Sequence, residues 1–193
     1  MVISGYKRAL VLAENELMNR EPEVIANNAG VAWTGKTFEL PWFGRFVSYD
    51  QGSIEERILW AHYMLAQGPR RARNIYITYK QVPGAAIYNA NFVKRCIDPM
   101  VKKHKSDLSA FFDAGVRLGG RRVDLGHMAF TLDALPYIPI TFVIWQGDEE
   151  VRPSGNILFD EGVIEWLCPE DIVVLASLSV RELIKDTLMT PGG

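Results

Sequence analysis

Two apolar segments near residues 127–133 and 139–146 constrain the fold more than any other part of the chain. They read HMAFTLD and PITFVIWQ, and only a short segment containing Pro136 separates them. A short connection joins antiparallel neighbours, whereas parallel strands need a crossover of about a dozen residues or more. Because both segments are largely apolar, we expect both strands in the centre of a sheet.

Helical patterns flank these strands in the sequence. Apolar residues recur at helical spacing over 6–20 and 53–67, and the second pattern starts with a capping box formed by Ser53 and Glu56. A long C-terminal helix is predicted to begin at Pro169, with acids in its first turn.

The segments between these helices complete the predicted architecture. We expect a hairpin or meander over 31–52, short strands at 74–79 and 156–160, and a helical region over 89–120 that Pro99 starts or kinks. No clean β-α-β alternation with a glycine-rich first loop is present. The pattern predicts a single α+β domain over residues 1–193, with a largely antiparallel sheet packed by helices from both termini and the middle.

Charge is distributed unevenly although the formal net charge is only −2. Nine Lys or Arg and one acid lie between Arg70 and Lys105, whereas ten acids and three bases lie between Asp148 and Asp186. Either the two segments lie side by side and neutralise each other, or the basic segment faces an anionic ligand. Because the chain is acidic overall and has no nucleic-acid-binding motif, we do not expect nucleic acid as a partner.

The sequence predicts a cytoplasmic protein outside the membrane. No apolar run reaches 18 residues, and the first residues lack the apolar region and cleavage site of a signal peptide. The two cysteines, Cys96 and Cys168, cannot complete a structural zinc site or an iron–sulfur cluster within the chain. We expect both to be buried, reduced thiols.

Three histidines are candidate bases or ligands. His62 lies in the predicted helix over 53–67, where we expect it to be packed or solvated, and His104 lies in VKKHK, a predicted solvated basic face. His127 follows Asp124 by three residues at the start of a strand. That pair can form a base or a metal ligand, but more often makes a hydrogen bond at a strand edge.

The segment GVAWTGKT fits the spacing of a P-loop. A P-loop needs a buried strand before it and a helix that starts at its Lys-Thr, so that backbone N–H groups can hold phosphate. Here helix-like sequence precedes the match and strand-like sequence follows it. We interpret it as a hairpin turn.

The acids of WQGDEEVRPSGNILFD are the strongest candidate site. Asp148, Glu149 and Glu150 follow the most apolar strand, and Asp160 ends the next short segment. If the two segments pair, the carboxylates of Asp148, Glu150 and Asp160 can converge on a divalent metal. The alternative is a polar turn at 148–150, with Asp160 as the cap of the following helix.

The same region resembles a known family. LPYIPITFVIWQGDEEVRPSGNILFDEGVIEWLCPEDI is similar to the signature region of the DUF3786 family of prokaryotic proteins of unknown function, with a W-x-G-D-E-E turn, then I-L-F-D and a distal E-D. LPWFGR, ILWAHYMLAQG and YITYKQVPGAAIYNANF fit the same family. The resemblance therefore covers most of the chain.

The resemblance implies a compact protein of anaerobic bacteria or archaea. Some members carry an appended iron–sulfur module of a type found in corrinoid proteins, which this chain lacks because it has two cysteines. By association, the family implies an accessory of anaerobic corrinoid or one-carbon metabolism. A corrinoid or a divalent metal is then the candidate cofactor, and an anaerobic metabolic enzyme or an iron–sulfur or corrinoid protein is the candidate partner.

Two functional interpretations remain open. The first is an accessory protein that binds an anionic or tetrapyrrole-like ligand, or a partner enzyme, in a cleft beside residues 70–105. The second is a metal-dependent enzyme that uses the carboxylates at 148–160. The candidate ligand-binding residues are Arg45, Tyr88, Trp145, Asp148, Glu149, Glu150 and Asp160. The aromatic residues Trp42, Phe43, Trp60 and Tyr63 either add apolar walls or belong to the ordinary core.

Overall fold

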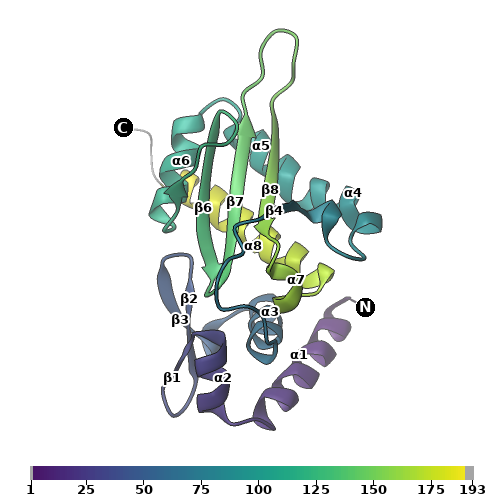
Figure 1. Cartoon of the computed structure of the whole chain (residues 1–193), viewed down its shortest axis with the longest axis vertical. Coiled ribbons are helices and arrows are strands. Elements are labelled where there is room, and N and C mark those ends of the chain that lie inside the picture. The colour runs from purple at the N-terminus through teal and green to yellow at the C-terminus, as the bar shows by residue number, and fades with distance from the viewer. Residues whose placement is uncertain (1, 190–193) are drawn as a thin grey trace.

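Two antiparallel sheets form the β part of the computed structural model, which describes residues 2–189 (Figure 1). The larger sheet has the strand order β4-β8-β7-β6-β5. Its strands are β4 (Tyr76–Thr78), β5 (Arg121–Arg122), β6 (Met128–Leu135), β7 (Ile138–Trp145) and β8 (Ser154–Asp160). The two strands predicted to be central, β6 and β7, are neighbours inside this sheet, which confirms the prediction.

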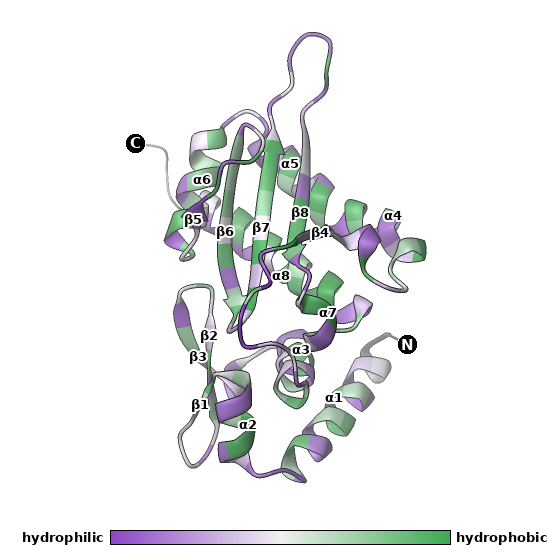
Figure 2. Ribbon diagram, viewed as in Figure 1, coloured by the Kyte–Doolittle hydropathy of each residue, from purple (hydrophilic) through white to green (hydrophobic). Residues whose placement is uncertain are grey.

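Helices cover one face of the large sheet. These are α5 (Asp98–His104), α6 (Leu108–Arg117) and α8 (Pro169–Met189), which lie behind the strands in Figure 1. Phe111 of α6 packs with its ring centroid 4.9 Å from that of Phe130 in β6. Phe142 of β7 is also buried, and burying each such side chain contributes roughly 1.5–3 kcal/mol. The apolar character of β7 is visible in Figure 2, where the loop that follows it is mostly hydrophilic.

The small sheet and three helices occupy the other end of the molecule (Figure 1). The sheet contains β1 (Ala32–Trp33), β2 (Phe38–Trp42) and β3 (Arg45–Ser48), and beside it lie α1 (Val2–Met18), α2 (Pro22–Ala29) and α3 (Ile54–Leu65). The predicted meander is confirmed. The capping box is present too, because Ser53 Oγ accepts from the Glu56 N–H and Glu56 Oε2 accepts from the Ser53 N–H. The P-loop match falls on the turn between β1 and β2, as the hairpin interpretation predicts.

The helical region before α6 changes its winding at Pro99. It consists of η3 (Ala86–Tyr88), α4 (Asn89–Phe92), the π-helical η4 (Val93–Ile97) and α5. Proline has no N–H to donate to the carbonyl four residues earlier, that of Arg95. The N–H of Asp98 instead reaches the carbonyl of Val93, five residues back. The predicted break at Pro99 is therefore a π-turn that leads into α5.

Short elements connect the layers. They are η1 (Tyr49–Gln51), η2 (Tyr79–Gln81) and α7 (Val163–Trp166). Together the elements give the α+β architecture that the sequence predicts. Within residues 2–189, no helix combines the length and the apolar character needed to cross a membrane.

Two predictions about side-chain environments are wrong. His104 does not lie on a solvated face: it is buried, and its Nδ1 and Nε2 lie 3.0 Å from the Met100 carbonyl and 2.9 Å from Thr187 Oγ1. Cys96 is buried as expected, but Cys168 is exposed. The error at His104 has a tertiary cause, since Thr187 of α8, which is distant in the sequence, meets its ring.

Candidate functional site

A pocket of about 430 Å³ lies where α1, α3 and the first turn of α8 meet the segment from η2 to η4. Ile58, Val173 and Val174 give it apolar walls, and Tyr79 and Tyr88 add aromatic surface. The polar groups that reach it are those of His62, Asn91, Arg95, Cys168, Glu170 and Asp171. Apolar walls with a few convergent polar groups are the usual composition of a small-molecule site.

His62 and Asp171 both line this pocket and contact each other. His62 Nδ1 lies 3.0 Å from both Oδ1 and Oδ2 of Asp171. His62 sits one helical turn after Ile58 on α3, and Asp171 sits in the first turn of α8, where the helix dipole favours a carboxylate. The packing of α3 against α8 therefore brings together two residues that are 109 positions apart in the sequence.

The hydrogen bond sets the chemistry of the imidazole. A carboxylate only accepts, so His62 Nδ1 carries the proton that is donated to Asp171. The hydrogen bond and the negative charge of Asp171 raise the pKa of His62 above its usual value, although burial opposes them. His62 Nε2 has no hydrogen-bond partner within residues 2–189. In the neutral ring this nitrogen is available as a base or a metal ligand.

Cys168 completes the network as a hydrogen-bond donor. Its Sγ lies 3.1 Å from Asp171 Oδ2. Loss of solvent around the sulfur, with the Asp171 charge as a further cause, raises the pKa of the Cys168 thiol to about 12. The thiol is therefore protonated at neutral pH and is no activated nucleophile. Its role in this geometry is to help hold the Asp171 carboxylate that orients His62.

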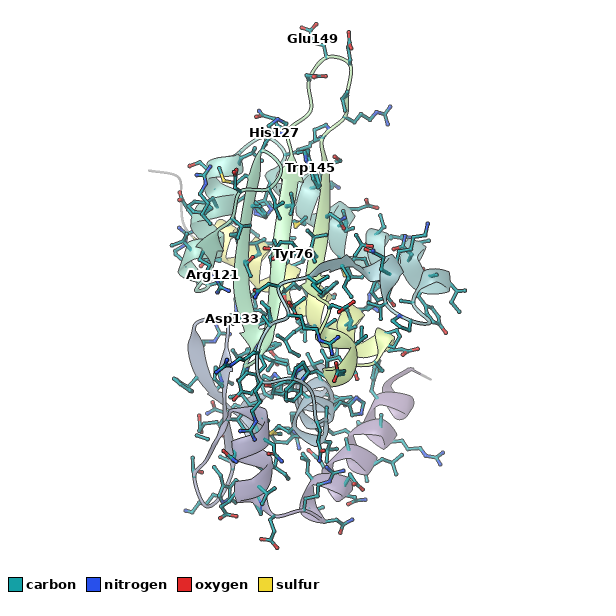
Figure 3. All side chains as sticks on the ribbon, in the orientation of Figure 1. Tyr76, Arg121, His127, Asp133, Trp145 and Glu149 are labelled. Atoms are coloured by element: carbon teal, nitrogen blue, oxygen red, sulfur yellow. The ribbon has the colours of Figure 1, made fainter. Side chains whose placement is uncertain are left out.

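One of the seven predicted ligand-binding residues lies in this pocket, and the other six lie elsewhere. Tyr88 lines it with 41% of its surface exposed. Arg45 on β3 instead pairs with Glu182 of α8 at 3.3 Å. Trp145 ends β7 near the base of the loop that projects from the large sheet (Figure 3). The four aromatic residues Trp42, Phe43, Trp60 and Tyr63 are buried in the core.

The acids at 148–150 form a polar turn in that projecting loop. Glu149 lies at its tip (Figure 3). Asp148 Oδ1 accepts from the backbone N–H groups of Glu150 at 2.9 Å and Val151 at 2.7 Å. These two bonds lower the pKa of Asp148. The carboxylate of Asp148 thus accepts hydrogen bonds from the backbone of its own loop.

Asp160 lies at the opposite end of β8 and is buried. Its Oδ1 accepts from the N–H groups of Arg73 at 3.0 Å and Gly162 at 2.9 Å, and its Oδ2 accepts from the N–H of Asn74 at 2.7 Å. The length of β8 separates it from the loop by roughly 20 Å, at about 3.3 Å per residue. The structure does not bring Asp160 together with Asp148 and Glu150, and within residues 2–189 no group of three or more His, Cys, Asp or Glu is placed to hold a metal ion.

The two charged segments do meet in part. Arg73 pairs with Glu161 at 3.1 Å and also with Glu165. Arg70 donates to Asn28 Oδ1 at 2.8 Å. The ion pairs of Arg73 support the interpretation in which the basic and acidic segments neutralise each other.

Little in the sequence pointed to the His62 pocket. A single histidine in an amphipathic helix has the same sequence pattern whether its side chain lines a pocket or packs in the core. The distal E-D of the family resemblance includes Asp171, and this is the one signal that pointed to it. Only the packing of α3 against α8 in the folded structure shows that His62 is the partner of that carboxylate.

Comparison with known proteins places these residues within one family domain. A family model described as a domain of unknown function (DUF3786) matches residues 21–182. No curated protein and no solved structure matches the chain. The matched range includes His62, Cys168 and Asp171, so the network at the pocket lies within the shared domain.

Proposed function

Because the chain belongs to the DUF3786 family, a family of unknown function, we propose a function from the pocket: the protein is an accessory protein that binds a small ligand at His62. One observation carries this proposal. His62 Nδ1 is held 3.0 Å from both oxygens of Asp171, which leaves Nε2 as the free nitrogen of the ring. A volume of about 430 Å³ is within the range of roughly 300–1,000 Å³ for small-molecule sites.

A corrinoid, or another cofactor of anaerobic one-carbon metabolism, is the ligand class that the family resemblance favours. A histidine whose other ring nitrogen donates to a carboxylate is a common metal-ligand arrangement. His62 Nε2 is therefore suited to a cobalt centre or a divalent metal that such a ligand carries. The pocket of about 430 Å³ is too small to enclose a whole corrinoid, so it would hold only part of such a ligand. In this proposal the protein acts in the cytoplasm, and an iron–sulfur or corrinoid protein is a separate partner.

The first experiment is a titration with hydroxocobalamin, followed by absorption spectroscopy, on protein purified without oxygen. We expect a spectral shift for the natural protein and for the His127→Ala control, and none for His62→Ala. His127 is a suitable control because it is an exposed histidine outside the pocket. An equal shift in His62→Ala would show that the corrinoid binds elsewhere, and no shift in any form would refute the corrinoid assignment.

A second experiment tests ligand binding at His62 without assuming a corrinoid. Native mass spectrometry of the same three forms would detect a small molecule that copurifies with the protein. We expect the natural protein and His127→Ala to retain it, and His62→Ala to lose it. Retention by all three forms would contradict a ligand site at His62.

Acid–base catalysis is a second candidate function, and the same contact favours it. A histidine oriented by a carboxylate, with its pKa raised by that partner, is the usual arrangement of a general base. Under this alternative, Asp171→Asn would still bind the ligand but would not convert it. The metal-dependent enzyme built on the acids at 148–160 has less support, because each oxygen of Asp160 already accepts from backbone N–H groups.

A further inference from the structure

A second hollow lies outside the His62 pocket. It is a groove of about 710 Å³ between the η4–α5 segment and the residues that lead into β8. One wall is an apolar ridge of Val93, Ile97 and Val101, which follow one another at intervals of four residues, and Pro153 faces it. The groove is thus apolar along one side.

Three cations line the groove from two parts of the chain. Lys102 and Lys105 come from the end of α5, and Arg152 comes from the loop before β8. None of the three forms an ion pair with a side chain in residues 2–189. The dipole of α5 favours lysines in its last turn, but it does not account for Arg152. Other cations, such as Arg73 and Arg117, meet carboxylates instead.

The backbone of the apolar wall is unusual. Val93 and Ile97 are the first and last residues of the π-helical segment η4. Single π-turns are rare and are frequent at functional sites. Here the wider turn precedes Pro99, and the ridge continues from it to Val101 of α5. The groove therefore combines an irregular helix with unpaired positive charge.

Asp98 is the one acid among the residues that line the groove. It lies seven residues before Lys105, which is about 10 Å along a helix at 1.5 Å per residue. Lys105 is thus separated from this carboxylate, whereas Lys102, four residues after Asp98, lies on the same side of the helix as Asp98. Two lysines and one arginine against one aspartate leave an excess of two positive charges.

We propose that this groove binds a phosphorylated small molecule with an apolar body. The excess charge matches a phosphate dianion, Arg152 can bind two of its oxygens at once, and the ridge of Val93, Ile97 and Val101 packs against the apolar part. This site is separate from the His62 pocket, and the two share no lining residue.

The test compares three probes on the full chain: 1-naphthyl phosphate, 1-naphthol and inorganic phosphate. We expect 1-naphthyl phosphate to bind with a Kd at least tenfold lower than that of either of the others, because only it carries both the charge and the apolar body. Its binding should shift the backbone amide signals of Ser154 and Gly155, which line the groove, in heteronuclear NMR spectra.

Two double variants with the same change in net charge locate the site. Lys102→Glu with Lys105→Glu is expected to raise the Kd for 1-naphthyl phosphate at least tenfold. Lys94→Glu with Lys103→Glu, on the same helical segment but outside the groove lining, should change it less than twofold. Arg152→Ala, a milder change in the loop, should raise the Kd severalfold and leaves the helix intact.

Four results would overturn the proposal. They are equal losses of affinity in both double variants, binding of 1-naphthol as tight as that of its phosphate, amide shifts confined to the His62 pocket, and no binding of 1-naphthyl phosphate. Cosedimentation with phosphatidic acid vesicles separates a free ligand from a lipid headgroup. Sedimentation that depends on Lys102 and Lys105 would show that the groove binds a membrane surface instead of a small molecule.

Discussion

The acids in the β7–β8 loop and the buried acids of the core differ in the groups that contact them. Asp148, Glu149 and Glu150 are consecutive and exposed, and the bonds of Asp148 stay within its own turn. Asp160 and Asp171 each stand next to a single glutamate in the sequence, and both are buried. Each of them binds groups that are distant in the chain: Asp160 holds the backbone at 73–74, and Asp171 orients His62.

This difference shows that clustering in the sequence is a poor guide to the role of an acid. A carboxylate at an exposed turn exchanges water for backbone N–H groups at little net gain. A buried carboxylate must be paired, because an unpaired one is costly in an apolar environment. The partners of a buried acid are therefore set by the tertiary structure. The acid in turn fixes the position of these partners or changes their pKa.

The largest expected effect is that of Asp160→Ala. This change removes the acceptor of three backbone N–H groups, those of Arg73, Asn74 and Gly162. Since leaving a buried donor unpaired costs about 1–3 kcal/mol, we expect the free energy of unfolding to fall by about 3 kcal/mol. Urea denaturation followed by circular dichroism measures it.

Asp148→Ala is the matched control for that measurement. It removes two backbone bonds in an exposed loop, where water can replace the carboxylate, and we expect a loss below about 1 kcal/mol. Equal losses for the two variants would remove the distinction between the loop acid and the buried acid.

An intermediate effect is expected for Asp171→Asn, and it depends on pH. The folded protein raises the pKa of His62, so this pair stabilises the fold fully below the unfolded pKa of about 6.5. That contribution is lost as the pH rises through the folded pKa of His62. The natural protein should therefore lose more stability than Asp171→Asn between pH 6 and pH 8.

NMR titration of the imidazole signals tests the cause of that pH dependence. We expect the pKa of His62 to fall in Asp171→Asn, because Asp171 is the group that raises it. A His62 pKa that does not respond to the substitution would show that Asp171 does not control the ring.

The smallest expected effect is that of Glu149→Gln combined with Glu150→Gln. Both side chains are exposed, and neither forms an ion pair with residues 2–189. We expect the free energy of unfolding to change by less than about 0.5 kcal/mol, with an unchanged His62 titration. A larger loss in urea denaturation would indicate that the loop acids contribute to the folded core.

Local sequence was sufficient for most of the secondary structure. The apolar runs predict β6 and β7 as neighbours in a sheet, Ser53 and Glu56 predict the start of α3, and Pro99 predicts a break in the helical region. These features depend on residues that are close in the chain. The short edge strand β5 was not predicted, because two residues, Arg121 and Arg122, carry no alternating pattern.

The sequence by itself determined the α+β class and the central strand pair, because backbone propensity and side-chain periodicity act over a few residues. Only the tertiary structure decided that His104 is buried, that Cys168 is exposed and that His62 meets Asp171. Burial and pairing depend on which surfaces pack together, and α8 brings its side chains to α3 and α5 from more than 60 positions away in the chain.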